Sequence, residues 1–165
     1  MVSYCLFCNT NRCRQIASEI QRRFGLTAYS PTIIQRKWIK GTCHEETKDY
    51  LPGYVFVYAQ APVLTFREIK SIDGVLRFLG ATEEAYILNG ADRRFAEMIH
   101  QNHGQIGIFQ AFQVGGKVCL TGNSLAGAEG EIVKLDRRKG RAQIQFHFDG
   151  RSFRIWAGID LLQNK

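Results

Sequence analysis

A cationic segment in the last third of the sequence is the feature best suited to binding chemistry. Four of the five residues from Arg137 to Arg141 are Arg or Lys, and Gly140 predicts that they form the tip of a hairpin. Several positive charges on an exposed tip can bind phosphate groups, which gives affinity and salt dependence but no selection of sequence. The segment therefore predicts contact with a nucleic acid, although a solvated, inert turn would have the same composition.

An arginine and a tryptophan follow this segment on the next predicted strand. Arg154 and Trp156 alternate with Phe153 and Ile155, so they point outward if the two apolar side chains fill the core. An exposed Trp beside an Arg can stack on an unpaired base, whereas a Trp packed against the rest of the protein cannot, and the sequence leaves both interpretations open. The residues predicted to bind RNA are Lys117, Lys134, Arg137, Arg138, Lys139, Arg141, Arg151, Arg154 and Trp156.

The residue types that usually carry catalysis or bind metals are poorly arranged for either task. Cys5 and Cys8 form a CxxC pair and Cys43-His44 could complete a zinc site, but residues three apart on a strand point to opposite faces. The four histidines lack a partner in a nucleophile motif, and the sequence contains neither a Walker loop nor a GxGxxG motif. We therefore expect a protein that is not an enzyme and that needs no cofactor or metal.

Charge and hydropathy narrow the class of partner. The chain carries a formal net charge of +7, and residues 107–165 hold nine Lys and Arg against five Asp and Glu. This excess favours an anionic partner for the C-terminal part. No apolar run approaches the roughly 18 residues of a membrane span, and the N-terminus has no basic leader. We therefore expect a cytoplasmic, monomeric protein without a membrane partner.

Two different patterns divide the chain. Over residues 1–103 strand and helix signals alternate, which predicts one compact α/β layer that includes a hairpin with its turn at Gly41. From Val114 onward, four short strand patterns separated by glycines predict a small barrel of the SH3 type. Residues 107–113 carry no charge and no clear period, which is typical of a linker. The predicted boundaries are a first domain at 1–106, a linker at 107–113 and a barrel domain at 114–165.

Three motifs resemble a known family. Residues 51–57 (LPGYVFV) and 73–80 (DGVLRFLG) look like the N-terminal domain, called NGN, of the NusG family of transcription elongation factors. Residues 123–133 (NSLAGAEGEIV) resemble the KOW motif of that family. The resemblance implies an α+β protein with an NGN-type α/β sandwich followed by a small SH3-like β-barrel, the KOW domain. The short N-terminus and the basic residues 137–141 make the chain similar to a specialised paralog of the LoaP type, with an RfaH-like protein as the second choice.

The resemblance also implies a binding surface for the clamp helices of RNA polymerase. The positions that match the hydrophobic part of this surface are Tyr4, Leu51, Tyr54 and Phe56. The positions that match the neighbouring polymerase contacts are Thr65, Phe66, Arg67, Ile72 and Asp73. Arg12 and Arg14 match positions at which the family approaches non-template DNA.

These expectations combine into a processive transcription antitermination or elongation factor that binds polymerase through its first domain and a nascent RNA hairpin through its KOW domain. The alternative is a general elongation factor whose barrel binds a ribosomal protein or Rho through an apolar tip at Phe148, before Gly150-Arg151. Asp149 places a carboxylate at this tip, which disfavours either protein contact. A third alternative is a ribosome-associated RNA-binding protein, because KOW barrels also occur in that class.

Overall fold

The computed structural model describes residues 1–62, 65–115, 117–120 and 131–162, and it divides into two compact units. The first unit consists of Met1–Pro31 and Leu51–Gly104, and the second of Thr32–Tyr50 and Gln105–Lys165. The hairpin that lies early in the sequence therefore belongs, by its contacts, to the same unit as the C-terminal strands. None of the described helices is long and apolar enough to cross a membrane.

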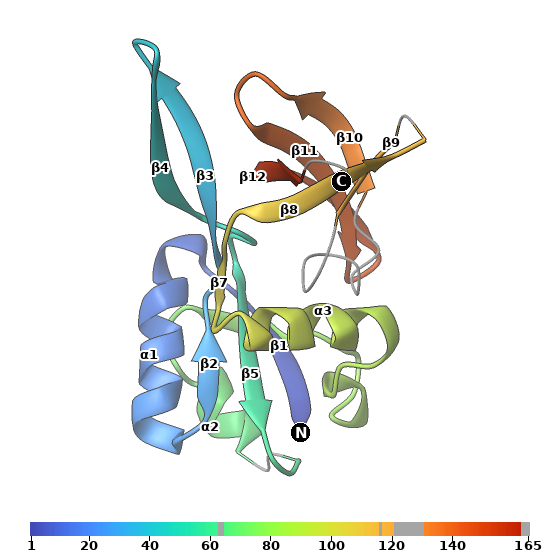
Figure 1. Cartoon of the computed structure of the whole chain (residues 1–165). Helices are drawn as coiled ribbons and strands as arrows, with labels where there is room; N and C mark the ends of the chain where they lie inside the picture. The colour runs from blue at the N-terminus through green and yellow to red at the C-terminus, as the bar shows by residue number, and fades with distance from the viewer. Residues whose placement is uncertain (63–64, 116, 121–130, 163–165) are drawn as a thin grey trace. The chain divides into compact units, whose positions relative to one another are not determined.

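The first unit is built on a four-stranded antiparallel sheet (Figure 1). The strand order is β2 (Thr27–Tyr29), β5 (Tyr54–Ala59), β1 (Val2–Cys8) and β6 (Val75–Phe78). All six residues of β5 are buried, because this β-branched and aromatic strand is covered on both faces.

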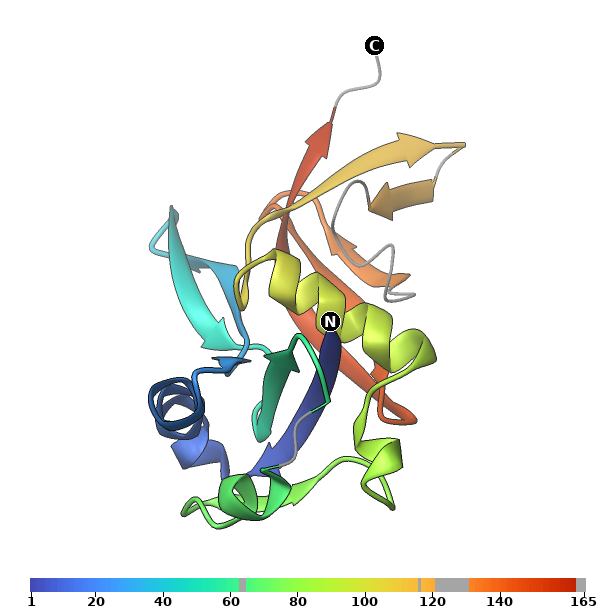
Figure 2. The same ribbon diagram turned by 90° about the horizontal axis from the view of Figure 1, so that it is seen from below.

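Helices cover both faces of this sheet (Figure 2). On one face, α1 (Cys13–Phe24) packs Ile16 and Ile20 into a core that also contains β5 residues, and α2 (Phe66–Lys70) adds Ile69. On the other face, α3 (Gly90–Gln101) places Phe95 with its ring centroid 6.1 Å from that of Phe56. Helix α1 ends where Gly25 adopts φ 64° and donates its N–H to the carbonyl of Gln21. Short 3-10 turns, η1 (Thr10–Arg12) and η2 (Glu84–Tyr86), complete the unit.

The second unit consists of a hairpin and a curled sheet. The hairpin pairs β3 (Thr32–Ile39) with β4 (Thr42–Asp49), and β3 also pairs in parallel with the short β7 (Gln105–Ile106). The five-stranded sheet has the order β10 (Glu131–Asp136), β11 (Arg141–Phe148), β12 (Arg151–Leu162), β8 (Phe109–Val114) and β9 (Lys117–Leu120). Its β12–β8 pair is parallel and its other pairs are antiparallel. Alternate residues of β11, from Ala142 to Phe148, are buried.

The predicted α+β class and the predicted hairpin are confirmed, and the turn lies at Lys40-Gly41, where φ is 48° and 79°. The segment expected to be a linker, residues 107–113, is largely a strand, because Phe109–Val114 forms β8. Its Phe109 and Ala111 are buried and its backbone pairs with β12 and β9. Most of the KOW-like motif of residues 123–133 lies outside the described residues, since only residues 131–133 are described.

Candidate functional site

Strands β10, β11 and β12 present a polar face on the outside of the curled sheet, which we call the outer barrel face. On β11, Gln143 pairs with Trp156 and Gln145 pairs with Arg154, while the alternate residues of β11 are buried. Lys134 of β10 pairs with Gln143 and is exposed. Since strand neighbours alternate between faces, these side chains share one surface. The expected outward orientation of Arg154 and Trp156 agrees with this register.

Arg141 and Trp156 form a stacked pair on the outer barrel face. The guanidinium carbon lies 4.6 Å from the centroid of the indole ring, a cation–π geometry. The Nε atom of Arg141 lies 3.6 Å from Oδ2 of Asp136, which holds the arginine from the neighbouring strand. Trp156 is therefore half-buried under a cation, so its ring is not wholly exposed.

The turn between β10 and β11 (residues 137–140) carries the densest charge of the second unit. Asp136 accepts the backbone N–H of Lys139 at 3.1 Å, and Gly140 adopts φ 61°. Arg137 donates to Oε1 of Gln113 through both terminal nitrogens, each at 3.3 Å. Arg137, Arg138 and Lys139 are exposed. The turn is thus fixed by its backbone, while its cationic ends remain accessible to solvent.

The structure brings together most of the predicted RNA-binding residues and separates two. The residues gathered on the outer barrel face or in the adjoining turn are Lys134, Arg137, Arg138, Lys139, Arg141, Arg154 and Trp156. Arg151 begins β12 and pairs with Phe148, which lies seven residues from Arg141 along β11, or roughly 23 Å. Lys117 begins β9, which belongs to a different strand pair.

The alternation of residues 143–148 was visible in the sequence, but Gln143 and Gln145 were not among the predicted RNA-binding residues. Gln145 accepts a hydrogen bond from Nε of Arg154 at 3.0 Å. The Oε1 atom of Gln143 is buried and has no hydrogen-bond partner among the described residues. A buried acceptor without a partner is energetically costly.

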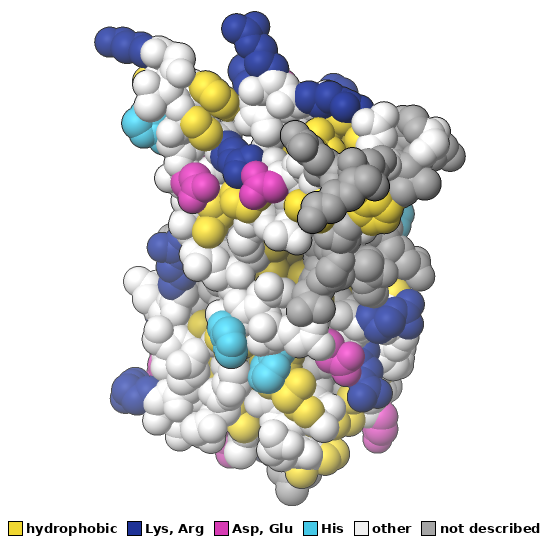
Figure 3. Space-filling view, viewed as in Figure 1, with side chains coloured by type: hydrophobic (Ala, Val, Ile, Leu, Met, Phe, Trp, Pro, Cys, Tyr) yellow, Lys and Arg dark blue, Asp and Glu magenta, His cyan; other side chains and the backbone are white. Residues whose placement is uncertain are grey.

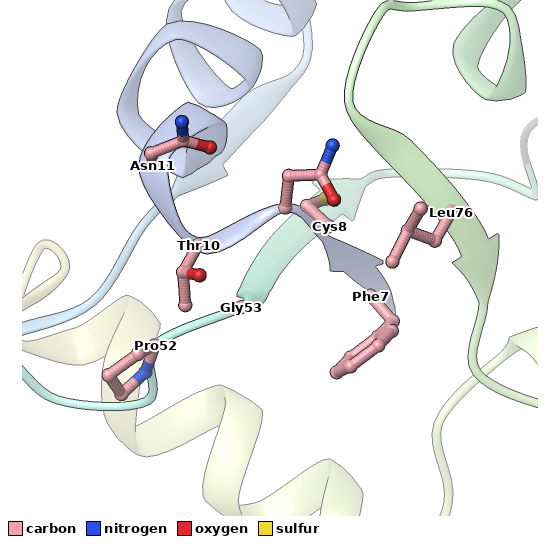
Figure 4. A pocket seen from close by; sticks show the side chains of 8 residues that line it. Phe7, Cys8, Thr10, Asn11, Pro52, Gly53 and Leu76 are labelled. Atoms are coloured by element: carbon pink, nitrogen blue, oxygen red, sulfur yellow. The ribbon is translucent and has the colours of Figure 1, made fainter.

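A second candidate surface lies in the first unit, where a shallow hollow of about 480 Å³ opens beside the end of β1. Its lining residues, shown in Figure 4, are Phe7, Cys8, Asn9, Thr10, Asn11, Pro52, Gly53 and Leu76. Leu76 is 56% exposed, and the guanidinium of Arg77 lies 5.6 Å from the ring centroid of Phe7. Burial, with a smaller effect from Cys13, raises the pKa of the Cys8 thiol to about 12. Cys8 is therefore a neutral thiol at neutral pH, which makes it a poor nucleophile.

The four residues predicted to form the hydrophobic polymerase surface are buried in this structure. Tyr4 is 1% exposed and packs edge-on against Phe66 and Phe78, while Phe56 is 0% exposed and packs against Phe95. Leu51 and Tyr54 are also buried. Tyr4 and Phe56 are core side chains because helices cover both faces of their strands. Leu76, which lines the hollow, is an exposed apolar side chain of this unit.

The other predicted contacts of the first unit differ in accessibility. Arg67, Asp73 and Arg14 are exposed, Thr65 and Phe66 are half-buried, and Ile72 is buried. Arg12 lies 3.6 Å from a carboxylate oxygen of Asp73 and also donates to the Asp73 carbonyl at 3.5 Å. The charge of Arg12 is therefore partly balanced by Asp73, and Arg14 is exposed on α1.

The barrel tip that would bind a ribosomal protein or Rho is also defined. Phe148 is 0% exposed, and Asp149 adopts φ 54° before Gly150. The apolar side chain of this tip points into the core, so it is not available to a protein partner in this state.

Comparisons with known proteins agree on one family. A family model described as "Transcription termination factor nusG" matches residues 2–96. The Pasteurella multocida (strain Pm70) "Transcription termination/antitermination protein NusG" is 24% identical over 116 residues, and the match covers 69% of this chain and 63% of that protein. The match thus spans less than two thirds of that relative's length. A solved structure, "Domain interaction in Thermotoga maritima NusG", matches with a TM-score of 0.58 and 14% identity over 95% of this chain and 93% of that chain. The likeness confirms an NGN-type α/β domain followed by a KOW-type barrel.

Proposed function

Because the chain belongs to the NusG family of transcription factors, we propose that it is a processive elongation factor that acts as an antiterminator. In this proposal residues 1–106 bind the clamp helices of RNA polymerase, and the KOW barrel of residues 114–165 binds a hairpin of the nascent RNA. The observation that carries the proposal is the cationic and aromatic surface formed by the outer barrel face and the β10–β11 turn.

The composition of this surface favours RNA over a protein partner. Its cations are Lys134, Arg137, Arg138, Lys139, Arg141 and Arg154. The exposed turn supplies phosphate contacts, and the Arg141–Trp156 pair supplies a flat surface on which an unpaired base can stack. A folded RNA with a paired stem and an unpaired loop offers both kinds of contact.

The first unit offers a separate surface for polymerase. Leu76 and the half-buried Phe7 supply exposed apolar area at the hollow, and Arg77 adds a charge beside it. Arg67, at the start of α2, is exposed and can reach a second polymerase element. Arg12 and Arg14 are the residues we propose for non-template DNA, and Arg14 is exposed on α1.

The basic turn supports assignment to a specialised paralog of the LoaP type rather than to a general elongation factor. A general factor would bind a protein through the barrel tip, and Phe148 of that tip is buried. An RfaH-like protein is the second choice. In both cases the barrel acts on a particular set of transcripts.

Transcription in vitro tests the proposed function. A template would encode an RNA stem-loop leader upstream of an intrinsic terminator, and a matched template would carry a scrambled leader. We expect the full chain to raise read-through by bacterial RNA polymerase on the first template, and to raise it much less on the second. No change in read-through on either template, despite demonstrated binding of polymerase, would contradict the proposal.

A further inference from the structure

The tip of the β3–β4 hairpin has a composition unlike the rest of that hairpin. Residues 37–44 include Lys37 and Lys40 but no Asp or Glu. Trp38 is 40% exposed and Ile39 is 47% exposed. The acidic residues of the hairpin lie outside the tip, on the part of β4 nearest its C-terminal end, where Glu46 pairs with Lys48 at 3.7 Å. The tip is therefore a cationic segment with two exposed apolar side chains.

Arg36 fixes this hairpin against the barrel within the second unit. Its Nη1 atom donates to the carbonyl of Ile159 at 2.7 Å and to that of Gly140 at 3.1 Å. Its Nη2 atom pairs with Oδ1 of Asp160 at 2.7 Å. A planar guanidinium can make several such bonds at once, and a lysine cannot reproduce that fork.

One glycine of the barrel leaves room for this arginine. A Cβ atom at Gly140 would lie 2.8 Å from Nη1 of Arg36, so a side chain at this position would displace the end of the guanidinium. A Cβ atom at Gly158 would lie in ordinary contact with Arg36, 3.4 Å from its Cγ, and would clash instead with Cδ1 of Ile108 at 2.5 Å.

Two further hydrogen bonds join the hairpin to the proposed RNA-binding surface. Nε1 of Trp38 donates to the carbonyl of Lys139 at 3.0 Å, in the basic turn. Nε2 of Gln35 donates to the carbonyl of Trp156 at 2.7 Å. The hairpin is therefore held beside the two elements that we assign to RNA. Figure 3 shows Lys and Arg side chains gathered at the end of the second unit, where the hairpin tip and the β10–β11 turn lie.

We propose that the hairpin tip, residues 37–44, is part of the RNA-binding surface. Lys37 and Lys40 contact phosphates, and Trp38 stacks on an unpaired base next to those held by the barrel. Arg36 is a positioning residue that holds the tip in register with the basic turn. This inference rests on the proposed function, and it extends the RNA-binding surface from the barrel to a segment that lies about 100 residues earlier in the chain.

Charge complementarity selects RNA as the occupant. The tip and the turn together present Lys37, Lys40 and four cations of residues 137–141. The neighbouring carboxylates, those of Glu45, Asp136 and Asp160, are fewer, and that of Asp160 is already paired with Arg36. An acidic protein would also be attracted. However, an exposed indole among cations is the arrangement that binds single-stranded bases through stacking and backbone charge.

Fluorescence anisotropy of the full chain with a labelled RNA stem-loop that has an unpaired loop tests this inference. The variant Lys37→Ala/Lys40→Ala should bind roughly 10-fold more weakly at moderate salt. The slope of log K against log salt should also fall by roughly 1.5, since two phosphate contacts are lost. Lys48→Ala is the matched control, because it removes a lysine from the same hairpin outside the tip, and its affinity should not change.

Two variants separate stacking from positioning. Trp38→Ala should weaken binding of the stem-loop by roughly 10-fold, in the range of one lost stacking contact. The same variant should bind a fully paired RNA duplex as tightly as the wild type, because no unpaired base is present. Arg36→Lys keeps the charge but loses the fork. Arg36→Lys should therefore weaken binding of the stem-loop. Its free energy of unfolding should stay near that of the wild type, which shows that the fold is intact.

The barrel variant Arg137→Glu/Arg138→Glu separates failure of this inference from failure of the proposed function. If that variant loses RNA but all the tip variants bind as the wild type does, the inference is overturned and the proposed function stands. If the wild-type chain binds no RNA stem-loop, both are overturned. Weakened binding in the tip variants, with normal binding by Lys48→Ala, supports the inference.

Discussion

The guanidinium of Arg141 lies 4.6 Å from the ring centroid of Trp156, and the two side chains come from neighbouring strands of the barrel. One face of the indole is therefore covered by a cation that is itself held by Asp136. The pair forms a rigid, positively charged plane, and both arginine planes and aromatic rings can stack on unpaired bases.

Replacing Trp156 should weaken RNA binding more when the aromatic ring is lost than when a smaller ring remains. Trp156→Ala should reduce the affinity for an RNA stem-loop by about 1–3 kcal/mol, the range found for loss of one stacked base. Trp156→Phe should retain most of the affinity because an aromatic plane remains. Ser152→Ala, on the same face toward the other end of β12, is the control. Equal affinities of all three variants in anisotropy titrations would rule out a stacking role for Trp156.

Polymerase binding should depend on the exposed rim of the hollow rather than on the buried aromatic residues. Leu76→Glu should abolish retention of the chain on immobilised RNA polymerase without changing its unfolding, since Leu76 is 56% exposed. Leu162→Glu is the matched control, because Leu162 is 46% exposed and belongs to the second unit. Undiminished retention of Leu76→Glu would remove the hollow as the polymerase contact.

The barrel core should depend strongly on one phenylalanine. Phe146 is 1% exposed, and its ring centroid lies 5.1 Å from that of Tyr50 and 5.5 Å from that of Phe153. Phe146→Ala should therefore lower the free energy of unfolding by about 3–5 kcal/mol. Both tryptophans of the chain lie in the second unit, so tryptophan fluorescence during urea denaturation reports on that unit alone. As a control, Val133→Ala, at an exposed position, should change the free energy of unfolding by less than about 0.5 kcal/mol.

Thiol reactivity should divide the five cysteines into two groups. Cys43 and Cys119 are exposed and should react with a chromogenic disulfide reagent in the native protein, whereas Cys5, Cys8 and Cys13 are buried and should react only after unfolding. A native protein that reacts at more than two thiols would contradict the assigned burial.

The raised pKa of Cys8 predicts how stability depends on pH. Its pKa lies at about 12 in the folded chain against an ordinary value of 9.0, so above pH 9 the unfolded chain binds fewer protons at this residue than the folded chain does. Its contribution to stability is therefore fully present below pH 9 and is lost as the pH rises toward 12. Cys8→Ala should show a weaker decline in the free energy of unfolding over this interval, measured by urea denaturation. An identical decline in the wild type and the variant would contradict this assignment.

Local patterns predicted the elements that depend on near neighbours in sequence. The turn at Gly41 and the outward position of Arg154 follow from turn chemistry and strand periodicity, which act over a few residues. The change from alternating strand and helix signals to strand signals alone also predicted an α/β domain followed by a barrel, and the resemblance to a family added the expected binding surfaces.

Contacts between distant segments could not be predicted from the sequence. Residues 107–113 resemble a linker because they lack charge, but Phe109–Val114 forms a strand by pairing with β12, about 50 residues further on. The docking of Arg36 depends on the carbonyls of Gly140 and Ile159, and backbone carbonyls leave no signal in residue type. Tyr4 and Phe56 were assigned to a surface by resemblance, and their burial depends on helices that cover both faces of the sheet.

Binding of an RNA stem-loop by the full chain at two salt concentrations tests the central claim most directly. The wild type should bind, and Arg137→Glu/Arg138→Glu should lose most of the affinity and lower the salt slope by roughly 1.5–2. The control, Arg93→Glu/Arg94→Glu, reverses an adjacent pair of arginines on α3, and it should bind RNA as the wild type does. All three proteins should remain bound to RNA polymerase. Equal RNA affinities of the two charge-reversed proteins would contradict the assignment of the KOW barrel to RNA.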